Sequence, residues 1–267
     1  MTRLSFHKYH GAGNDFIIVD ERQQQFLSRH EDAPAMIARL CHRNFGIGAD
    51  GLMILQNDPE SDFKMFYYNS DGYEGSMCGN GGRCLVSYAW HQKIIPQESV
   101  FRATDGLHRA KVISGSSYHA QVALGMNDVK DIIPAGTNLF MDTGSPHLVI
   151  FTDSIRDLDV YEQGKALRYS PEFSPGGTNV NFAQMDGDHI HVRTYERGVE
   201  NETLACGTGI TAVAIAAYHK ELVQSSPVKI KATGGELSVD FDFENNTYQN
   251  IILQGPAEFV FRGEIDM

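Results

Sequence analysis

The 267-residue sequence has few cysteines, one tryptophan and no long apolar run. Its four cysteines are too sparse for a disulfide scaffold and lack the paired spacing of zinc ligands. No run approaches the ~18 apolar residues that span a bilayer, and residues 1–8 lack the apolar core of a signal peptide. We therefore expect a cytoplasmic protein without a bound metal, whose reduced thiols are available for chemistry.

Positive charge is also scarce, because 22 Lys and Arg residues face 34 Asp and Glu residues, for a formal net charge of -12. A chain of this charge repels phosphate backbones and anionic lipid, so we expect neither nucleic acid nor a membrane as a partner. The hydrophobic fraction of 42% and the charged fraction of 21% are ordinary for a globular protein. A small zwitterionic ligand is compatible with this composition.

The chain does contain an internal repeat. The motif Cys-Gly-Asn-Gly at 78–81 returns as Cys-Gly-Thr-Gly at 206–209, at an offset of 128 residues, which is close to half the chain. Three further pairs keep the same order at offsets of 131, 129 and 127: residues 13–20 with 144–150, 48–50 with 177–179, and 67–69 with 194–196. Four collinear pairs predict two similar domains.

Local patterns indicate the content of each domain. Short β-rich runs bounded by Gly, Asn and Asp predict strands at 15–20, 52–55, 63–68, 148–152 and 189–195. A helix is predicted after each cysteine motif, at 83–91 and 210–220. The second of these is apolar on every face, and such a helix belongs inside a domain.

Together these patterns predict an α/β (α+β) fold of two pseudo-symmetric domains. Each is expected to be a mixed, barrel-like β-sheet around a central helix, with the active site in the cleft between the domains. We place the first domain at residues 1–122 and the second at 123–255, with the crossing near 120–131. The strand-like run at 258–262 makes residues 256–267 candidates for a return to the first domain.

Each repeated cysteine stands immediately before a predicted helix, where unpaired backbone N–H groups and the helix dipole favour a negative charge. Those N–H groups can hold a substrate carboxylate, and they can also stabilise a thiolate. Inversion of a stereocentre needs one group to remove a proton from one face and another to deliver one to the opposite face. Cys78 and Cys206 are therefore the candidate acid/base pair, whereas Cys41 and Cys84 are interpreted as small core residues.

With the motifs at 77–84, 205–209, 10–16 and 195–198, the sequence resembles the diaminopimelate epimerase family from about residue 5 to about residue 262. Proline racemases share the two cysteines but typically have His where this chain has Asn80. The resemblance implies interconversion of LL- and meso-diaminopimelate without pyridoxal phosphate or another cofactor, on the route to lysine and peptidoglycan. It also implies two barrel-like domains and a homodimer.

The resemblance further implies roles for individual residues. Cys78 would take the proton from the L centre and Cys206 from the D centre, and Asn14 would contact the reacting end of the substrate. The reacting carboxylate would be held by Gly79, Asn80, Gly207 and Thr208. The distal end would be recognised by Asn69, Asn179 and Arg197, with the backbone of Glu196 and Arg197 at its ammonium, while His147 and Glu196 would lie near the thiols and the reacting ammonium.

Two positions depart from a familiar form of the family. Many members have Gln where this chain has Gly51, and Asn where it has Ser145 before Pro146 and His147. In the family these side chains serve the reacting ammonium and the distal carboxylate, respectively, so different contacts are expected here. Neither departure changes a cysteine.

Other functions are compatible with parts of the pattern. A proline-racemase-like racemase would use the same two thiols on another amino acid. A thiol redox protein would need a resolving cysteine, and Cys78 and Cys84 are six residues apart without a C-x-x-C motif. A non-catalytic amino-acid-binding module would bind ligand without exchanging its α-proton.

Overall fold

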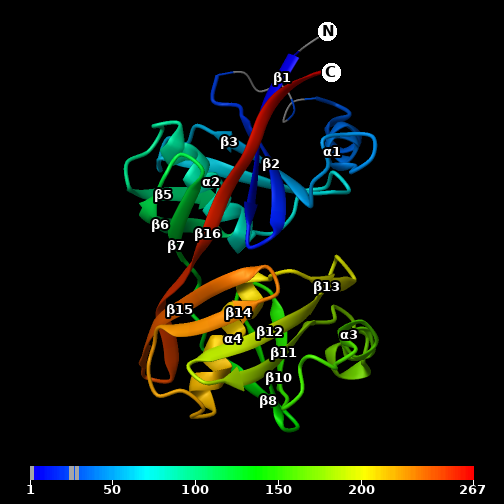
Figure 1. The fold of residues 1–267 in the computed structure, drawn as a ribbon, viewed down its shortest axis with the longest axis vertical. Helices are drawn as coiled ribbons and strands as arrows, with labels where there is room; N and C mark the ends of the chain where they lie inside the picture. The colour runs from blue at the N-terminus through cyan, green and yellow to red at the C-terminus, as the bar shows by residue number, and fades with distance from the viewer. Residues whose placement is uncertain (1–2, 24–26, 28–29) are drawn as a thin grey trace. The chain divides into compact units, whose positions relative to one another are not determined.

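The computed structural model describes residues 3–23, 27 and 30–267, and the chain divides into two compact units. Unit 1 comprises Met1–Leu124 with Pro256–Met267, and unit 2 comprises Gly125–Gly255. Each unit is built from strands around one long helix (Figure 1). Within the described ranges, no helix combines the length and the apolar character needed to cross a membrane.

A closed ring of strands forms unit 1. In the described part of the chain, its members in order around the ring are β1 (Arg3–Gly11), β2 (Asn14–Asp20), β3 (Gly51–Gln56), β4 (Phe63–Asn69), β5 (Glu98–Ala103), β6 (Gly106–Gly115), β7 (His119–Gly125) and the second part of β16 (Thr247–Asp266). The pairs β2–β3 and β4–β5 are parallel, and β16 closes the ring against β1. Helix α2 (Gly79–His91) lies inside this ring, so its first eleven residues are all buried.

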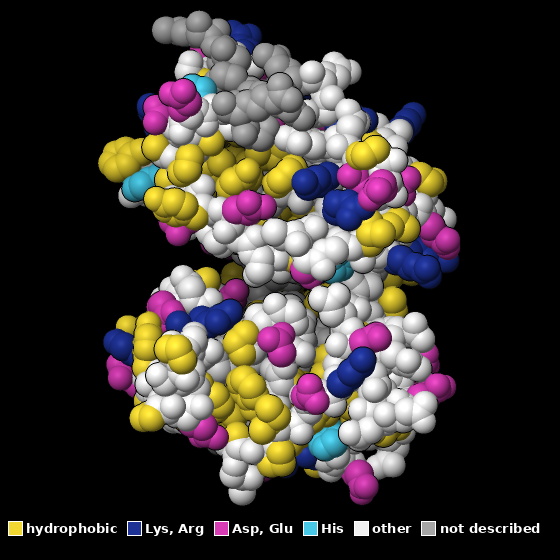
Figure 2. All heavy atoms as spheres, turned by 180° about the vertical axis from the view of Figure 1, so that it is seen from behind, with side chains coloured by type: hydrophobic (Ala, Val, Ile, Leu, Met, Phe, Trp, Pro, Cys, Tyr) yellow, Lys and Arg dark blue, Asp and Glu magenta, His cyan; other side chains and the backbone are white. Residues whose placement is uncertain are grey.

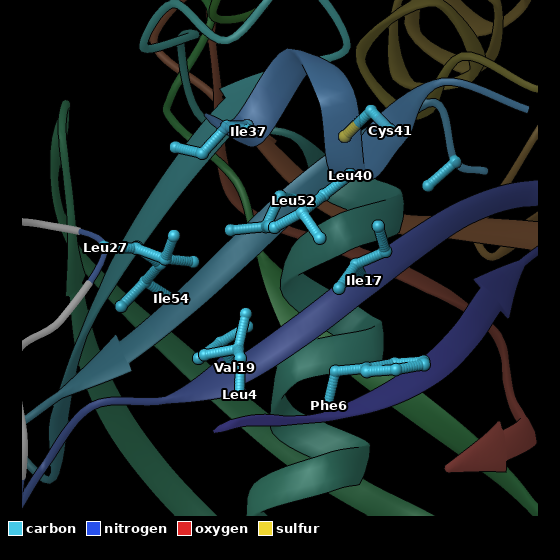
Figure 3. Close-up of a cluster of buried hydrophobic side chains, with 11 residues drawn as sticks. Leu4, Phe6, Ile17, Val19, Leu27, Ile37, Leu40, Cys41, Leu52 and Ile54 are labelled. Carbon is cyan, nitrogen blue, oxygen red and sulfur yellow. The ribbon is translucent and has the colours of Figure 1, made fainter. Parts of the chain in front are cut away.

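A second layer covers the outer face of β1 to β3. Helix α1 (Ala33–Cys41) turns Ile37, Leu40 and Cys41 towards apolar side chains of these strands (Figure 3). Because α2 packs on the inner face, β2 and β3 are apolar on both sides, which explains the continuous burial of β3. Strand β2, which begins at Asn14, is thereby held from inside and outside the ring.

Unit 2 repeats this plan. Its strands in sheet order are the first part of β16, β15 (Gly235–Glu244), β14 (Val228–Ala232), β12 (His189–Glu196), β11 (Asn179–Asp186), β10 (Pro146–Phe151), β9 (Asn138–Asp142) and β8 (Ile132–Ala135), with β13 (Asn201–Thr203) on β12. The parallel pairs are β10–β11 and β12–β14, which correspond to β2–β3 and β4–β5. Helix α4 (Gly207–His219) is the enclosed helix, and α3 (Val160–Arg168) packs outside against β11 and β12.

The sequence repeat is therefore a structural repeat. Gly13 and Gly144 precede β2 and β10 with φ of 83° and 106°, and Gly48 and Gly177 precede β3 and β11 with φ of 82° and 65°. These left-handed backbone conformations favour glycine, which explains why the two halves share it at these turns. The prediction of two pseudo-symmetric α/β halves, each with a central helix, is confirmed.

The expected strands are present with shifts of one or two residues at their ends, and 258–262 lies within β16. Both central helices begin earlier than predicted, at Gly79 and Gly207 instead of 83 and 210. Glycine lowers intrinsic helix propensity, so the sequence pattern hid these first turns. A Cβ on Gly81 would lie 1.6 Å from Met53 Cε, so a larger residue there would require the end of the Met53 side chain to move.

The surface agrees with the charge of the chain. On the described part of the face shown in Figure 2, Lys and Arg side chains lie singly or in small groups among acidic ones and form no broad basic area.

Candidate active site

Cys78 is the N-cap residue of α2, with an extended backbone at φ -110° and ψ 115°. The Gly81 N–H donates to Cys78 Sγ at 3.5 Å, and the thiol points to Asn14 Oδ1 at 3.8 Å. A thiolate would use the N–H donor, whereas a thiol would use the carbonyl acceptor. Cys78 therefore has a hydrogen-bond partner in both protonation states, as an acid/base group that alternates between them requires.

The amide of Asn14 is held in one orientation. Its Nδ2 donates to Asp50 Oδ2 at 2.8 Å, while its Oδ1 accepts from Asn80 Nδ2 at 3.2 Å. A carboxylate oxygen can only accept, so the Nδ2 must face Asp50 and the Oδ1 must face Asn80 and Cys78. This assignment places an acceptor beside the Cys78 thiol.

Charged residues support this arrangement from outside. Arg43 donates to Asp15 at 2.8 Å and to Asp50 at 2.6 Å, and Lys8 lies 2.6 Å from Asp15 and also bonds the Gly48 carbonyl. Burial alone would raise the pKa of Asp15, but hydrogen bonds from Arg43 and Lys8 hold it well below its usual range. The network fixes the turn before β3 and thereby the Asp50 acceptor.

Cys206 occupies the equivalent place in unit 2. It is the N-cap residue of α4, with φ -116° and ψ 111°, and is only 7% exposed. Its Sγ lies 3.5 Å from Thr208 Oγ1, which in turn lies 2.9 Å from His147 Nε2 and 3.2 Å from Ser145 Oγ. One hydroxyl group, that of Thr208, thus lies between His147 and the Cys206 thiol.

His147 is a fully buried, neutral imidazole. Thr194 Oγ1 donates to Asn181 Oδ1 at 3.0 Å, so the Asn181 amide turns its Nδ2 to His147 Nδ1 at 3.1 Å. Nδ1 is therefore the hydrogen-bond acceptor, and Nε2 carries the hydrogen and donates a hydrogen bond to the hydroxyl of Thr208 or Ser145. Burial, with a further contribution from Arg197, lowers the pKa of His147 to about 3, although the Asn181 hydrogen bond opposes the shift. The neutral ring orients Thr208 and is no proton acceptor at neutral pH.

The low pKa of His147 predicts a pH-dependent stability. Between its unfolded value of 6.5 and its folded value of about 3, the unfolded chain binds a proton that the folded chain does not. Stability from this residue is therefore complete above pH 6.5 and falls by up to about 1.4 kcal/mol per pH unit below it. We expect His147→Gln to remove this slope, as measured by urea unfolding between about pH 4 and pH 7. An equal dependence of the unfolding free energy on pH in wild type and His147→Gln would contradict the assignment. His42 is exposed, so His42→Gln is the control variant and should keep the wild-type dependence.

Two of the predicted distal-end residues, Asn179 and Arg197, contact each other in unit 2. Arg197 N–H donates to Asn179 Oδ1 at 2.8 Å, and Asn179 Nδ2 donates to the Pro146 carbonyl at 2.8 Å. The Asn179 side chain thus joins the turns before β10 and after β12. Arg197 itself has an exposed side chain, which reaches the Gly176 carbonyl at 3.5 Å. Glu196 Oε2 accepts from Thr203 Oγ1 at 2.9 Å.

The two half-sites use equivalent positions with different side chains. Asn14, Asp50, Asn69 and Asn80 of unit 1 correspond to Ser145, Asn179, Glu196 and Thr208 of unit 2. Asn14 lies 3.2 Å from Asn80, and Ser145 lies 3.2 Å from Thr208. Gly79 and Gly207 are the first residues of the two helices, and Asn69 is exposed at the end of β4. In the described part of the chain, no three His, Cys, Asp or Glu side chains are grouped to hold a metal ion.

At Gly51, the space for a longer side chain is filled. A Cβ added to Gly51 would lie 2.5 Å from Tyr67 Cε2 and 2.6 Å from the Tyr68 carbonyl oxygen. The ring of Tyr67 also packs edge-on against Phe16, at 6.1 Å between ring centroids. Tyr67 therefore occupies the place that a Gln at position 51 would need.

We expect Gly51→Gln to lower the free energy of unfolding by about 1–3 kcal/mol, because the added side chain overpacks this site. Adding Tyr67→Ala to this variant should recover part of the lost unfolding free energy. The remaining part should stay lost, because the clash with the Tyr68 backbone is still present. Urea unfolding measures both effects. Gly176→Gln at an exposed position is the matched control, and a loss of the same size there would refute the steric explanation.

The remaining two thiols are core residues, as predicted. Cys41 is the last residue of α1 and is buried, and Cys84 is fully buried on α2. Burial raises the pKa of Cys41 to about 12 and raises that of Cys84 still further. Neither thiol is suited to form a thiolate near neutral pH.

Known proteins similar to this chain agree with the duplicated architecture. The family model described as diaminopimelate epimerase matches residues 6–118 and again residues 139–260. A diaminopimelate epimerase of Flavobacterium psychrophilum is 46% identical over 263 residues, covering 98% of this chain and 100% of that protein. One from Chlorobaculum tepidum is 43% identical, covering 96% of this chain and 99% of that protein.

Solved structures of low sequence identity share the fold. A phenazine biosynthesis protein of the PhzF family from Bacillus anthracis matches with a TM-score of 0.77 at 15% identity, covering 100% of both chains. A hydroxyproline epimerase from Agrobacterium vitis matches with a TM-score of 0.73 at 13% identity, covering 98% of this chain and 92% of that one. With the family model matched in both halves and relatives at this identity over nearly the whole length, the chain belongs to the diaminopimelate epimerase family of isomerases.

Proposed function

We propose that this chain interconverts LL- and meso-diaminopimelate by exchanging the α-proton between Cys78 and Cys206, without pyridoxal phosphate or a metal. The observation that carries the proposal is the duplicated N-cap cysteine on an enclosed helix. Both residues have the same extended backbone, and each is followed by the first-turn N–H groups of its helix. A family of epimerases with matching halves gives the substrate class.

In the proposed mechanism the two thiols act on opposite faces of one α-carbon. Cys78 removes the proton of the L centre while Cys206 delivers one to the other face, and the roles are exchanged in the reverse direction. The first-turn N–H groups at Gly79, Asn80, Gly207 and Thr208 bind the reacting carboxylate. They stabilise the negative charge that spreads from the α-carbon into this carboxylate, because they are already oriented before the reaction.

Neutral polar groups beside the thiols suit the reacting ammonium group of a zwitterionic substrate. An imidazole that stays neutral does not repel the reacting ammonium, so His147 can orient Thr208 without an electrostatic penalty. The carboxylate of Glu196 is the proposed partner of this ammonium. Asn14 supplies a further polar contact at the reacting end from the Cys78 half.

For the distal amino-acid end we propose Arg197, Asn69 and Asn179. The exposed guanidinium of Arg197 has the planar donor geometry that matches a carboxylate. Asn179 supports Arg197 through the hydrogen bond to its backbone N–H. Recognition of this end is what would distinguish diaminopimelate from a short amino acid such as proline.

The burial of Cys84 supports a thiol redox function less well than an epimerase function. The resolving partner of Cys78 on the same helix would be Cys84, which is fully buried and has a raised pKa. Such a thiol is a poor nucleophile for disulfide exchange. Retention of thiol–disulfide activity after Cys206→Ala, with no deuterium entering diaminopimelate, would favour this alternative.

The decisive experiment is incubation with LL-diaminopimelate in D₂O, with both isomers and α-deuterium followed by NMR. We expect meso product and deuterium at the inverted centre. Tight ligand binding without α-proton exchange would instead identify an amino-acid-binding module. Exchange with proline in place of diaminopimelate would identify a proline-racemase-like enzyme.

We also propose a homodimer in the cytoplasm. The dimer follows from the family resemblance, and the four free cysteines suit a reducing compartment. Light scattering of the purified chain distinguishes a dimer from a monomer.

A further inference from the structure

Arg83 is a buried cation without a carboxylate partner. It is 0% exposed, and in the described residues no Asp or Glu is among the partners of its guanidinium. Its three hydrogen bonds go to neutral oxygens: Asn80 Oδ1 at 2.8 Å, the Gly79 carbonyl at 3.4 Å and the Pro256 carbonyl at 3.4 Å. Burial of an unpaired charge is strongly unfavourable unless something in the protein uses it.

The nearby groups that can become negative are thiols. The hydrogen bonds to Gly79 and Asn80 place the Arg83 guanidinium against the first turn of α2, which directly follows Cys78. A thiolate at Cys78 and one at Cys84 would each raise the pKa of Arg83, against the burial that lowers it to about 10. Cys84 is buried away from solvent, so Cys78 is the thiol that can ionise during a reaction.

A chain of amides connects the cation to the Cys78 thiol. Arg83 Nη2 donates to Asn80 Oδ1, Asn80 Nδ2 donates to Asn14 Oδ1, and Cys78 Sγ lies 3.8 Å from that same oxygen. Other charged or titratable groups around this end of α2 are Asp15, Asp50, Glu258 and His10, of which Asp15 is neutralised by Arg43 and Lys8. Compared with these groups, Arg83 is a cation that is fully buried and connected to the Cys78 thiol through two amides.

The other half lacks this cation. The position equivalent to Arg83 is Thr211, which is also fully buried. Thr211 Oγ1 donates to the Gly207 carbonyl at 3.1 Å, just as Arg83 donates to the Gly79 carbonyl. Both residues thus donate a hydrogen bond to the carbonyl of the first residue of their helix. Thr211 makes this contact without a charge, so the contact alone does not explain the charge of Arg83.

We propose that Arg83 is a positioning residue whose charge stabilises the thiolate of Cys78, so that the two thiols of the enzyme are electrostatically unequal before substrate binds. Arg83 also fixes Asn80, and through it Asn14, in the orientation described above. The inference rests on the proposed role of Cys78 as a base. It implies that the unit 1 half-site starts as the base for the L centre.

The test is the pH dependence of Cys78 alkylation by iodoacetamide in the full chain, with each cysteine peptide quantified by mass spectrometry. Wild type, Arg83→Lys and Arg83→Met are compared. We expect the midpoint for Cys78 to rise by about one pH unit in Arg83→Met and to stay near the wild-type value in Arg83→Lys, which keeps the charge. An unchanged midpoint in Arg83→Met overturns the proposal, as does a similar rise in Arg83→Lys.

Cys206 provides an internal control in every sample, because its alkylation midpoint should not move with Arg83. A shift of both cysteines together would show general loosening of the fold and would overturn the specific role. Thr211→Val is the matched variant on the other helix and should leave the Cys78 midpoint unchanged. If Arg83→Met does not fold, Arg83→Gln takes its place, because glutamine removes the charge but keeps hydrogen-bond donors; an unchanged Cys78 midpoint in Arg83→Gln likewise overturns the proposal.

The readout does not depend on turnover, which separates this proposal from the proposed function. An unshifted Cys78 midpoint in Arg83→Met with normal epimerisation by wild type refutes only the role of Arg83. Absence of α-proton exchange by wild type refutes the epimerase function, whatever the midpoint does.

Discussion

Alanine at position 78 or at position 206 is expected to lower the rate of diaminopimelate epimerisation by about 10³-fold or more. Each substitution removes the group that serves one face of the α-carbon. In unit 1 the other polar groups near Sγ are amides, and in unit 2 they are hydroxyls and a neutral imidazole. None of these is a base of comparable strength at neutral pH. The rate is measured as conversion of LL to meso isomer, with circular dichroism to verify the fold.

The two core thiols provide the control for this experiment. Cys41→Ala and Cys84→Ala remove a buried thiol from α1 and from α2, respectively. They therefore report the effect of losing a thiol that has no catalytic role. We expect both to keep epimerase activity within a few-fold of wild type, with a loss of stability from the small cavities. Epimerisation by Cys78→Ala or Cys206→Ala at a comparable rate would refute the two-base mechanism.

The second large effect is expected at Arg197. Arg197→Met should raise KM for diaminopimelate by about 10²-fold, because a charge-assisted, two-pronged contact to the distal carboxylate is lost. Its guanidinium is exposed and its one side-chain hydrogen bond, to the Gly176 carbonyl, is long at 3.5 Å, so the fold does not depend on it. Steady-state kinetics separates the expected rise in KM from any change in kcat.

Arg197→Lys distinguishes recognition from general attraction. Lysine keeps the charge but not the planar fork, so an intermediate KM is expected. A fall in kcat with KM unchanged would place Arg197 at the reacting end and contradict the assignment. Because Arg197 also contributes to the low pKa of His147, the stability of Arg197→Met at pH 5 to 7 shows whether that second effect disturbs the site.

The sequence was sufficient for the features that depend on local pattern and repetition. The repeated motifs at 78–81 and 206–209 predicted one central helix in each half, although the helices begin at Gly79 and Gly207, a few residues before the predicted starts. The turns at Gly13 and Gly48 recur as Gly144 and Gly177 for a backbone reason, namely positive φ. The outer helices α1 and α3 were not predicted, since each has only nine residues and no counterpart motif links them in the sequence.

Contacts between segments that are distant along the chain could not be predicted from the sequence. Asn181 reads as one polar residue within the β11 run, and only the fold brings its amide to His147 Nδ1 and to the α4 turn at Gly209. A polar residue flanked by Val180 and Phe182 in a strand buried on both faces was the available signal. The ion network of Lys8, Arg43 and Asp50 joins three segments that are separated along the chain, so spacing could not reveal it.

The position of β16 has a consequence for how the protein is made. The ring of unit 1 closes only when residues 258–266 pair with β1, which precedes them by about 250 residues in synthesis. At roughly 5–20 residues per second, the first strands emerge from the ribosome many seconds before their closing partner, while residues 125–255 already contain every strand of the second sheet. The half that is translated first is thus the half that completes last, and in the meantime the unpaired edges of β1 and β7 are available to chaperones or to aggregation.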